Sequence, residues 1–451
     1  MPSSKLTFRH PDHNELWFLP LGGCGEIGMN LNLFGHDGQW LMVDCGITFE
    51  RTVTGVQQIE MPDTLAAKDI FDHLCGMIAT HAHEDHIGAL PYLDPPLSTP
   101  IYTTPFTAGV IREKFRGRPD QPIIHEVGSL GTKTLGPFRV TWLPITHSTP
   151  ETHALLIETP AGNILHTADW KIDKEPQIGA PFNSNAFRHS LLPSIDAAIV
   201  DSTNALQPGF SKSEGAIKRG LQAAISAAEG RVIVGCFASN IARIQLLGEI
   251  AARTDRHLAL AGRSLLNMSR IARQCGYLTG EFPEIPLSDL GYLPQSHTLL
   301  IATGSQGEPG SALQRLARDD HPDLRLMPGD RVILSAKTIP GNERAVEAMI
   351  KGFTALGAEV LAADQAPDLD LHASGHPNQG ELEHFYNLLK PRRVIPVHGE
   401  PRHMLANASV ARATGVKGCL TGQNGDLFVL SDPGLIKRQW MPTGRIAVKR
   451  P

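Results

Sequence analysis

The chain has 451 residues, of which 41% are hydrophobic and 19% charged, and its net charge is −5. This length predicts two or three structural units, and the composition excludes disordered, collagen-like and coiled-coil proteins. No stretch approaches the roughly 18 apolar residues of a membrane span, and the N-terminus lacks the apolar segment of a signal peptide. We therefore expect a cytoplasmic protein with no membrane partner. The acidic balance argues at first against a nucleic-acid partner, because phosphate-binding surfaces are usually basic.

The counts of cysteine and histidine favour histidine chemistry. The six cysteines show no paired spacing, which argues against both a disulfide framework and a cysteine zinc ribbon. The 20 histidines are four times as many as either the tryptophans or the tyrosines, and many stand in short clusters.

The first predicted elements are three strands at residues 16–21, 29–35 and 39–46. Glycine-rich turns separate these apolar or alternating runs, a pattern typical of hairpins at a sheet edge. The turn at residues 23–28, GCGEIG, matches the dinucleotide-binding pattern G-x-G-x-x-G. That motif must open a helix, but the residues that follow, MNLNLF, alternate like a strand. We therefore predict a tight glycine turn and no nucleotide site.

The later elements divide the chain into three parts. Apolar runs at residues 76–80, 100–105, 138–145 and 154–160 alternate with more polar or helical pieces, which predicts a layered α/β domain. Ser211 and Glu214 then form a predicted capping box for a helix that ends before Gly230. Five apolar runs between residues 231 and 363 predict a parallel sheet in a second lobe. Strands at residues 392–397 and 425–430 return to the style of the first domain. We predict a first domain at residues 1–205, an insert at 206–360, and the rest of the first domain at 361–451.

The most specific feature is THAHEDHIG at residues 80–88, directly after an apolar strand. On a loop at a strand end, His81 and His83 can face one metal ion, while Asp85 and His86 face a second after the chain turns. Imidazole suits zinc and manganese, and a carboxylate suits a harder cation. Four such side chains in six residues predict a metal site.

Other strand ends supply further candidate ligands. His147, Asp169 and His398 each follow an apolar strand, and Asp44 follows another. Any one of them alone could be a turn residue. Together they predict ligands that converge at one edge of a sheet, with the carboxylate of Asp44 orienting a ligand histidine.

HAHEDH matches the H-x-H-x-D-H signature of the metallo-β-lactamase fold, a four-layer αββα sandwich that holds two divalent metal ions. The segments DSTNALQPGFSKSE, GCFASNIARIQ, ATGSQGEP, TIPGNE, HASGH and VHGE resemble the β-CASP nucleases, and specifically bacterial ribonuclease J. The resemblance runs from about Leu19 to the end of the chain. It implies an α/β fold in which a β-CASP domain is inserted into the αββα sandwich.

The resemblance also implies an activity and a set of ligands. The activity is metal-dependent hydrolysis of single-stranded RNA, as a 5′-to-3′ exonuclease or an endonuclease, with a metal-bound hydroxide as nucleophile and 5′-phosphate products. The metal ions are expected to be zinc, with manganese as the alternative. The first would be held by His81, His83 and His147, the second by Asp85, His86 and His398, and Asp169 would bridge them.

Further residues gain substrate roles by resemblance. Asp85 would take the proton of the nucleophile, and His376 would contact the scissile phosphate and either stabilise charge there or protonate the leaving oxygen. The loop with His372, Ser374 and Gly375 would bind a phosphate, faced from the insert by Ser239, Asn240 and Arg243. Such a pocket favours a 5′-monophosphate.

Several alternatives remain at this point. A histidine at the position of His398 goes with RNA enzymes of this family, whereas DNA-repair members have an apolar residue there. A DNA nuclease is chemically equivalent, and a small-molecule hydrolase would share HAHEDH but not need the insert or HASGH. A non-catalytic RNA-binding protein would have lost ligands, and a diiron protein usually has a carboxylate where His83 stands. Family members usually continue into a C-terminal domain that is linked to assembly into oligomers. A homodimer is therefore one of the assembly states that we expect for this chain.

The net charge is unevenly distributed along the chain. The balance is −10 over residues 1–205, +2 over 206–360 and +3 over 361–451. Two bound divalent cations would offset part of the acidic excess in the first segment. Arginine suits phosphate contacts, and residues 231–280 carry seven: Arg231, Arg243, Arg253, Arg256, Arg263, Arg270 and Arg273. We therefore expect a basic groove between the lobes that leads to the metal ions.

Overall fold

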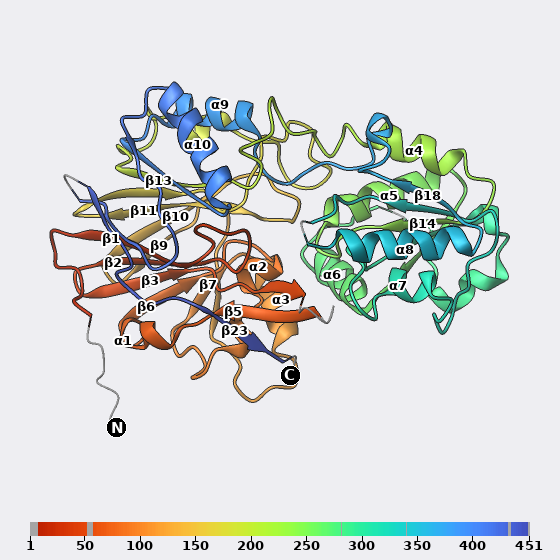
Figure 1. The fold of residues 1–451 in the computed structure, drawn as a ribbon, viewed down its shortest axis with the longest axis horizontal. Helices are drawn as coiled ribbons and strands as arrows, with labels where there is room; N and C mark the ends of the chain where they lie inside the picture. Colours follow the sequence, from red (N-terminus) through yellow and green to blue (C-terminus); the bar gives the residue numbers. More distant parts are fainter. Residues whose placement is uncertain (1–7, 52–56, 281, 340, 432–433, 450–451) are drawn as a thin grey trace.

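The computed structural model describes residues 8–51, 57–280, 282–339, 341–431 and 434–449. Figure 1 shows two lobes, one built from both ends of the chain and one from its middle. Two segments connect the lobes, one between β13 (Ala197–Asp201) and β14 (Val232–Gly235), the other between β18 (Glu359–Ala362) and α9 (Gln379–Leu389).

The larger lobe contains two mixed sheets that pack face to face. In the described part of the chain, the first sheet has eight strands and the second has seven. The first runs in the order β22 (Leu435–Lys437), β21 (Leu427–Val429), β1 (Leu16–Gly22), β2 (Leu31–His36), β3 (Gln39–Val43), β6 (Leu74–Ile78), β7 (Ile101–Thr103), β8 (Ile124–Glu126). The second runs in the order β20 (Gly418–Cys419), β19 (Arg393–Val397), β13, β12 (Gly162–His166), β11 (His153–Thr159), β10 (Phe138–Pro144), β9 (Thr132–Leu135).

Apolar side chains from both sheets form the core between them. Phe18 and Phe34 of the first sheet belong to the same buried cluster as Trp142 and Ile199 of the second. Burying a large apolar side chain stabilises a fold by roughly 1.5–3 kcal/mol relative to exposure. The core therefore holds both sheets rigidly, and with them the loops that leave their ends.

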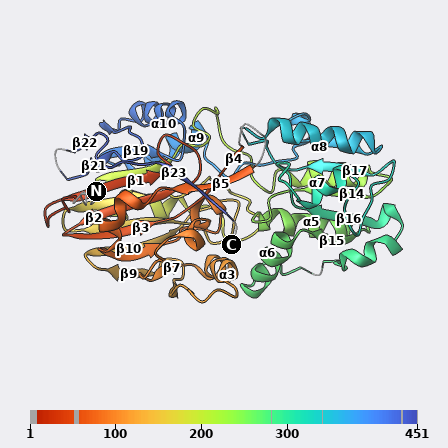
Figure 2. The same ribbon diagram turned by 60° about the horizontal axis from the view of Figure 1, so that its bottom comes forward.

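Helices cover the outer faces of the two sheets. Phe385 of α9 and Ala411 of α10 (Pro401–Ala413) pack on the second sheet. On the first sheet, Ile70 of α1 (Lys68–Phe71) and Phe106 of α3 (Pro105–Lys114) join a second buried cluster. The result is the expected four-layer αββα sandwich, seen from two directions in Figures 1 and 2. This lobe also has α2 (Glu84–Ile87), a small sheet of β23 (Arg445–Val448), β5 (Gln57–Pro62) and β4 (Thr48–Arg51), and 3-10 turns at Leu65–Ala67, Leu90–Tyr92 and Ser184–Phe187.

The inserted lobe has the parallel sheet that the apolar runs predict. Its order is β15 (His257–Ala261), β16 (Thr298–Ala302), β14, β17 (Arg331–Leu334), β18, and the pairs along it are parallel. Helices lie around this sheet (Figure 1). They are α4 (Lys218–Ser226), α5 (Ile241–Arg253), α6 (Arg263–Gln274), α7 (Ala312–Ala317) and α8 (Glu343–Ala355), with 3-10 turns at Leu287–Tyr292, Gln295–His297 and Pro367–Leu369.

Two local predictions are wrong. The first three strands lie inside the first sheet, because β21 pairs with β1 and β6 pairs with β3. The helix after residue 211 begins only at Lys218, and neither predicted capping residue caps it. Ser211 instead donates to Glu381 of α9, and Glu214 pairs with Arg243. Both partners are distant in sequence, so local spacing could not indicate them.

The glycine turn is confirmed. Gly23, Gly25 and Gly28 all have positive φ angles, which glycine adopts without steric cost. The turn leads into β2 and not into a helix. No helix in the described ranges is long and apolar enough to cross a membrane.

Candidate metal centre

The predicted ligands lie on loops that leave neighbouring strand ends. His81 and His83 follow β6, His147 follows β10, Asp169 follows β12, and His398 follows β19. We expected one sheet edge, but both sheets contribute, since β6 belongs to the first sheet and the other three strands to the second. The site therefore lies where the ends of the two packed sheets meet.

The backbone at these loops is unusual. Asp44, Ala168 and His398 have positive φ angles of 63°, 52° and 51°. Residues other than glycine rarely adopt this conformation, which costs of order 1–3 kcal/mol and persists where the surroundings impose it. Each of the three lies directly after a strand or next to a predicted ligand. Three of the non-glycine residues with positive φ angles thus lie at the candidate site, and others occur elsewhere in the described chain.

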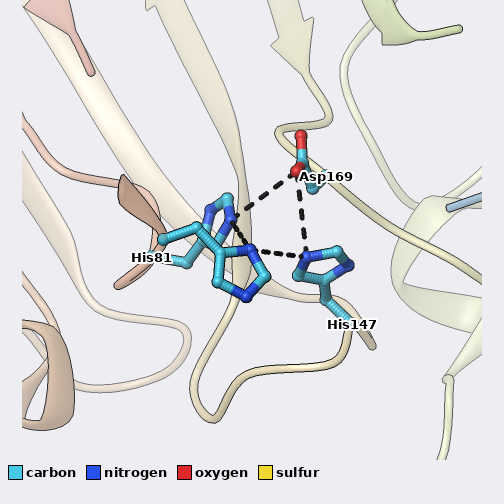
Figure 3. Close-up of side chains that lie close together, drawn as sticks. His81, His147 and Asp169 are labelled. Atoms are coloured by element: carbon cyan, nitrogen blue, oxygen red, sulfur yellow. Dashed lines mark hydrogen bonds and ion pairs between the residues drawn. The ribbon is translucent and has the colours of Figure 1, made fainter. Parts of the chain in front are cut away.

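The first cluster contains His81, His83, His147 and Asp169. The Nδ1 atom of His83 lies 3.1 Å from Nε2 of His81 and 3.1 Å from Nε2 of His147. The Oδ2 atom of Asp169 lies 3.7 Å and 3.8 Å from the same two Nε2 atoms. Figure 3 shows the side chains of His81, His147 and Asp169 pointing toward one another.

The second cluster shares Asp169 and adds Asp85, His86 and His398. Oδ2 of Asp169 lies 3.2 Å from Nε2 of His86, and Oδ1 lies 3.0 Å from Nδ1 of His398. Oδ2 of Asp85 lies 3.6 Å from Nε2 of His86 and 3.2 Å from Nε2 of His398. All seven predicted ligands therefore lie in two adjoining groups with one carboxylate in common.

Hydrogen bonds outside the clusters orient the rings. Nδ1 of His147 donates to the carbonyl oxygen of Gly375 at 2.7 Å, which leaves the Nε2 lone pair directed into the first cluster. Nδ1 of His86 lies 2.7 Å from Oδ2 of Asp44, so Nε2 of His86 faces the second cluster. Asp44 is itself held by the backbone N–H and the hydroxyl of Thr80. Such contacts fix the tautomer and direction of a ligand histidine, and Asp44 is placed where this prediction needs it.

The two clusters differ electrostatically, although burial acts on the histidines of both. Burial lowers the pKa values of His81 and His147, and it lowers the pKa of His83 to about 4. Burial also works to lower the pKa of His398, but the carboxylates of Asp169, Asp85 and Asp201 together outweigh it and raise the pKa. The first cluster is therefore held as neutral imidazoles, the form in which histidine binds metal ions.

The donor geometry fits metal ions. Ligands about 2.0–2.1 Å from a tetrahedral zinc ion lie about 3.3 Å from one another, and the separations in the first cluster lie around that value. Without a cation, lone pairs of neighbouring rings would face each other in a buried space. Nε2 of His398 is buried and makes no hydrogen bond of good geometry, although Oδ2 of Asp85 lies 3.2 Å away. A bound ion would satisfy this nitrogen. Both clusters can hold metal ions.

His376 lies beside the clusters together with a residue that we did not predict. Nδ1 of His376 donates to Oδ2 of Asp201 at 2.8 Å, and its ring lies 5.2 Å from that of His147 and 5.6 Å from that of His398. Burial opposes a charged His376, but Asp201 and Asp169 raise its pKa. Asp201 ends the buried strand β13, so the signal that indicated Asp169 and His398 could have indicated Asp201 as well.

The predicted phosphate turn, residues 372–376, lies against the metal centre. The carbonyl oxygen of Gly375 accepts the hydrogen bond from His147. Gly375 also has no room for a side chain, since a Cβ atom there would lie 2.6 Å from the His147 ring. The hydroxyl oxygen of Ser374 accepts from Nδ2 of Asn204 at 2.8 Å and from the N–H of His376 at 3.3 Å. Nδ1 of His372 is buried without a partner, and burial, with the nearby charge of Arg243, lowers the pKa of His372 to about 3.

The three insert residues expected to face this turn make different contacts. Arg243 is fully buried, and its guanidinium group bonds to Glu214 and to the carbonyl of Ser335. Asn240 is buried, and its side chain caps α5 by accepting from the N–H of Arg243. Ser239 is half-buried in the turn between β14 and α5. Arg243 is therefore a structural ion-pair residue, and the prediction that it contacts substrate is wrong.

The structure supports the expected arginine-lined groove only in part, because most of the seven arginines bond to other groups of the protein. Arg231 and Arg256 are buried and bond to backbone carbonyls, and Arg270 and Arg273 pair with Glu113 and Glu284. Arg253 and Arg263 are exposed. Five of the seven arginines thus bond to the protein's own carboxylates or carbonyls.

Comparison with known proteins places the chain in a family. Ribonuclease J of Sinorhizobium meliloti is 38% identical over 454 residues, which cover 99% of this chain and 80% of that protein. Ribonuclease J of Mycolicibacterium smegmatis is 40% identical over 88% of this chain and 71% of its own, and that of Thermus thermophilus is 37% identical over 97% and 77%. The chain belongs to the ribonuclease J family.

Domain models agree with this family and with the resemblance carried by the motifs. The metallo-beta-lactamase superfamily model matches residues 30–171, the ribonuclease J beta-CASP domain residues 229–353, and the Zn-dependent metallo-hydrolase RNA specificity domain residues 370–419. A crystal structure of a protein of unknown function from Enterococcus faecalis V583 has a TM-score of 0.66 at 16% identity, covering 92% of this chain and 100% of that one. This last likeness concerns the fold alone. The inserted β-CASP architecture predicted from the sequence is confirmed.

Proposed function

We propose that this metal-dependent ribonuclease hydrolyses phosphodiester bonds of single-stranded RNA from the 5′ end, leaving a 5′-phosphate and a 3′-hydroxyl. The observation that carries the proposal is the shared carboxylate of Asp169 between two ligand clusters, with His376 directly beside them. Two adjacent cation sites suit in-line attack on a phosphodiester, because each can stabilise one of the two oxygens that exchange at phosphorus.

His81, His83 and His147 would hold one divalent cation, and Asp85, His86 and His398 would hold the other, with Asp169 bridging both. The nitrogen-rich first cluster favours zinc, while the two carboxylates of the second also suit manganese. When bound, divalent cations would act as Lewis acids and make the attacking water molecule more acidic. Asp85, whose side chain is 30% exposed, would accept the proton of that water.

His376 would supply the proton to the leaving 3′-oxygen. Because its Nδ1 is engaged by Asp201, Nε2 is the ring nitrogen left for the substrate. The Asp201 carboxylate holds the ring in that orientation and favours the protonated form. The proton thus passes from His376 to the 3′-oxygen as the P–O bond breaks.

The turn at residues 372–376 would bind the terminal phosphate. Ser374 already accepts two hydrogen bonds at its hydroxyl oxygen, which leaves its O–H hydrogen to donate to a phosphate oxygen. His372 and Gly375 would line the same turn, and Ser239 and Asn240 would approach from the insert. A pocket of this kind near the metal ions would select a 5′-monophosphate.

The test is cleavage of 3′-labelled single-stranded RNA that carries a 5′-monophosphate, 5′-triphosphate or 5′-hydroxyl, in zinc or manganese. We expect stepwise release of 5′-mononucleotides from the monophosphate substrate. Replacing Asp169 by Asn should lower the cleavage rate by more than about 10³-fold, because both clusters lose a ligand. His13, which is exposed, provides a matched control as His13→Ala. Cleavage that persists in Asp169→Asn would contradict the proposal, as would equal cleavage of a matched DNA oligomer.

A homodimer and a cytoplasmic location stay predictions. Sedimentation of the purified chain over a range of concentrations would test the first, and cell fractionation would test the second.

A further inference from the structure

Lys171 is a buried lysine two residues after Asp169. Its side chain is 1% exposed, although lysine is almost never fully buried unless it is paired. Its chain neighbours belong to the loop that carries the shared carboxylate. The sequence gives Lys171 no role in the reaction, so its burial needs an explanation.

The ammonium group of Lys171 meets three separate segments. Nζ donates to the backbone carbonyl of Lys212 at 2.6 Å and to that of Ser374 at 3.0 Å, and lies 3.3 Å from Oδ2 of Asp173. Two of the three hydrogens of the ammonium group are thus donated to backbone carbonyls, and the ion pair with Asp173 balances its charge. Lys171 is therefore engaged by groups inside the protein.

Two of these contacts lie in the segments that connect the lobes. Lys212 belongs to the connection between β13 and β14, and Ser374 to the connection between β18 and α9. Ser374 also lies in the proposed phosphate turn, whose neighbour Gly375 bonds to His147. One buried charge thus joins the Asp169 loop to the turn and to the first connection.

The third contact keeps this arrangement in place. Asp173 accepts from the N–H of Glu214 at 3.0 Å and from that of Glu175 at 2.9 Å. Burial works to raise the pKa of Asp173, but the charge of Lys171 and the hydrogen bonds that Asp173 accepts together lower it. The Lys171 charge is thereby neutralised by a carboxylate that is itself fixed. A neutral side chain at position 171 would leave both backbone carbonyls without their donor.

We propose that Lys171 is a positioning residue that sets the distance between the phosphate turn and the metal centre. It acts through the carbonyl of Ser374, so its loss lets Ser374 move relative to Asp169, while the hydrogen bond from His147 to Gly375 keeps that ligand in place. Displacements of about 1 Å at a reacting centre can change rates by about 10²-fold. The inference rests on the proposed function, because it assumes that the turn reads the 5′-monophosphate.

The discriminating measurement is the ratio of kcat/KM for 5′-monophosphate RNA to that for 5′-hydroxyl RNA of the same sequence. In Lys171→Met we expect this ratio to fall by about 10-fold to 100-fold, with metal content per chain unchanged by mass spectrometry. Lys171→Arg keeps the charge but changes its geometry, and we expect an intermediate ratio. Lys174, three residues on and exposed, gives the matched control Lys174→Met, which should keep the wild-type ratio.

The outcomes separate the two proposals. If the wild-type protein does not cleave RNA or shows no preference for a 5′-monophosphate, the proposed function fails, and this inference fails with it. If the wild type shows the preference and Lys171→Met keeps the same ratio, Lys171 is only structural and the inference alone is overturned. Should Lys171→Met not fold, the ratio for Lys171→Arg decides, and a ratio within about twofold of the wild type overturns the inference.

Discussion

Buried polar groups are arranged in opposite ways in the two lobes. At the metal centre, ring nitrogens of His81, His83 and His147 lie close together and face one another. In the insert, Arg243 faces Glu214, and Arg256 donates to backbone carbonyls. The first arrangement lacks a positive charge at its centre, whereas the second is complete without any ligand. Buried charge alone therefore does not indicate a site, whereas buried donor atoms of one kind that converge on one point do.

The largest effect on stability is expected at the buried pair in the insert. Arg243→Met should destabilise the inserted lobe by about 3–5 kcal/mol, because it leaves the Glu214 carboxylate buried without its partner. Urea unfolding and calorimetry would measure this, and the exposed Arg263→Met should stay within about 0.5 kcal/mol of the wild type. Bound metal should not change.

The double variant Arg243→Met with Glu214→Gln tests whether the unpaired Glu214 carboxylate causes the loss of stability. It removes the uncompensated charge, so part of the lost stability should return. If Arg243→Met instead unfolds like Arg263→Met and loses RNA cleavage, Arg243 acts on substrate after all, and the contrast between the lobes does not hold.

A smaller effect is expected behind the metal centre, at Asp44. Asp44→Asn should weaken metal binding by about 10-fold to 100-fold, because His86 loses the carboxylate that orients it. The amide would also place N–H hydrogens against the N–H of Thr80 or Nδ1 of His86, which both contact Asp44 now. Competition with a coloured chelator would give the affinity. Asp37→Asn, at an exposed aspartate, is the control, and equal affinities in the two variants would show that Asp44 does not orient the ligand.

The metal centre could be predicted from the sequence because each candidate ligand stands in a recognisable short segment. His81, His83, Asp85 and His86 stand in one motif, and the other ligands each follow an apolar strand, so parallel strand ends could be expected to bring them together. Asp201 also stands at the end of an apolar strand, β13, so the same pattern indicates it, although our prediction did not include it.

The wrong predictions depend on contacts between distant residues. Ser211 and Glu214 have the spacing of a capping box, but their partners are Glu381 and Arg243. Arg243 stands in a motif that resembles a substrate loop, yet its side chain turns into the lobe. The parallel sheet of the insert follows from its apolar runs, whereas the destination of each polar side chain depends on tertiary packing that local patterns do not contain.

The smallest effect is expected where the two lobes touch, at Glu113 of α3. Its carboxylate accepts from Nδ2 of Asn267 and from the guanidinium of Arg270, both at 2.8 Å and both in α6. The Arg270 side chain is 45% exposed, so the pair is screened by solvent, and Glu113→Gln should cost less than about 1 kcal/mol. Calorimetry at low salt should resolve this loss, and about 0.5 M salt should remove it, because exposed charges are then screened. A loss of several kcal/mol that persists at high salt would mean that the lobes depend on this contact, and that neither can be treated as an independent arrangement of buried charge.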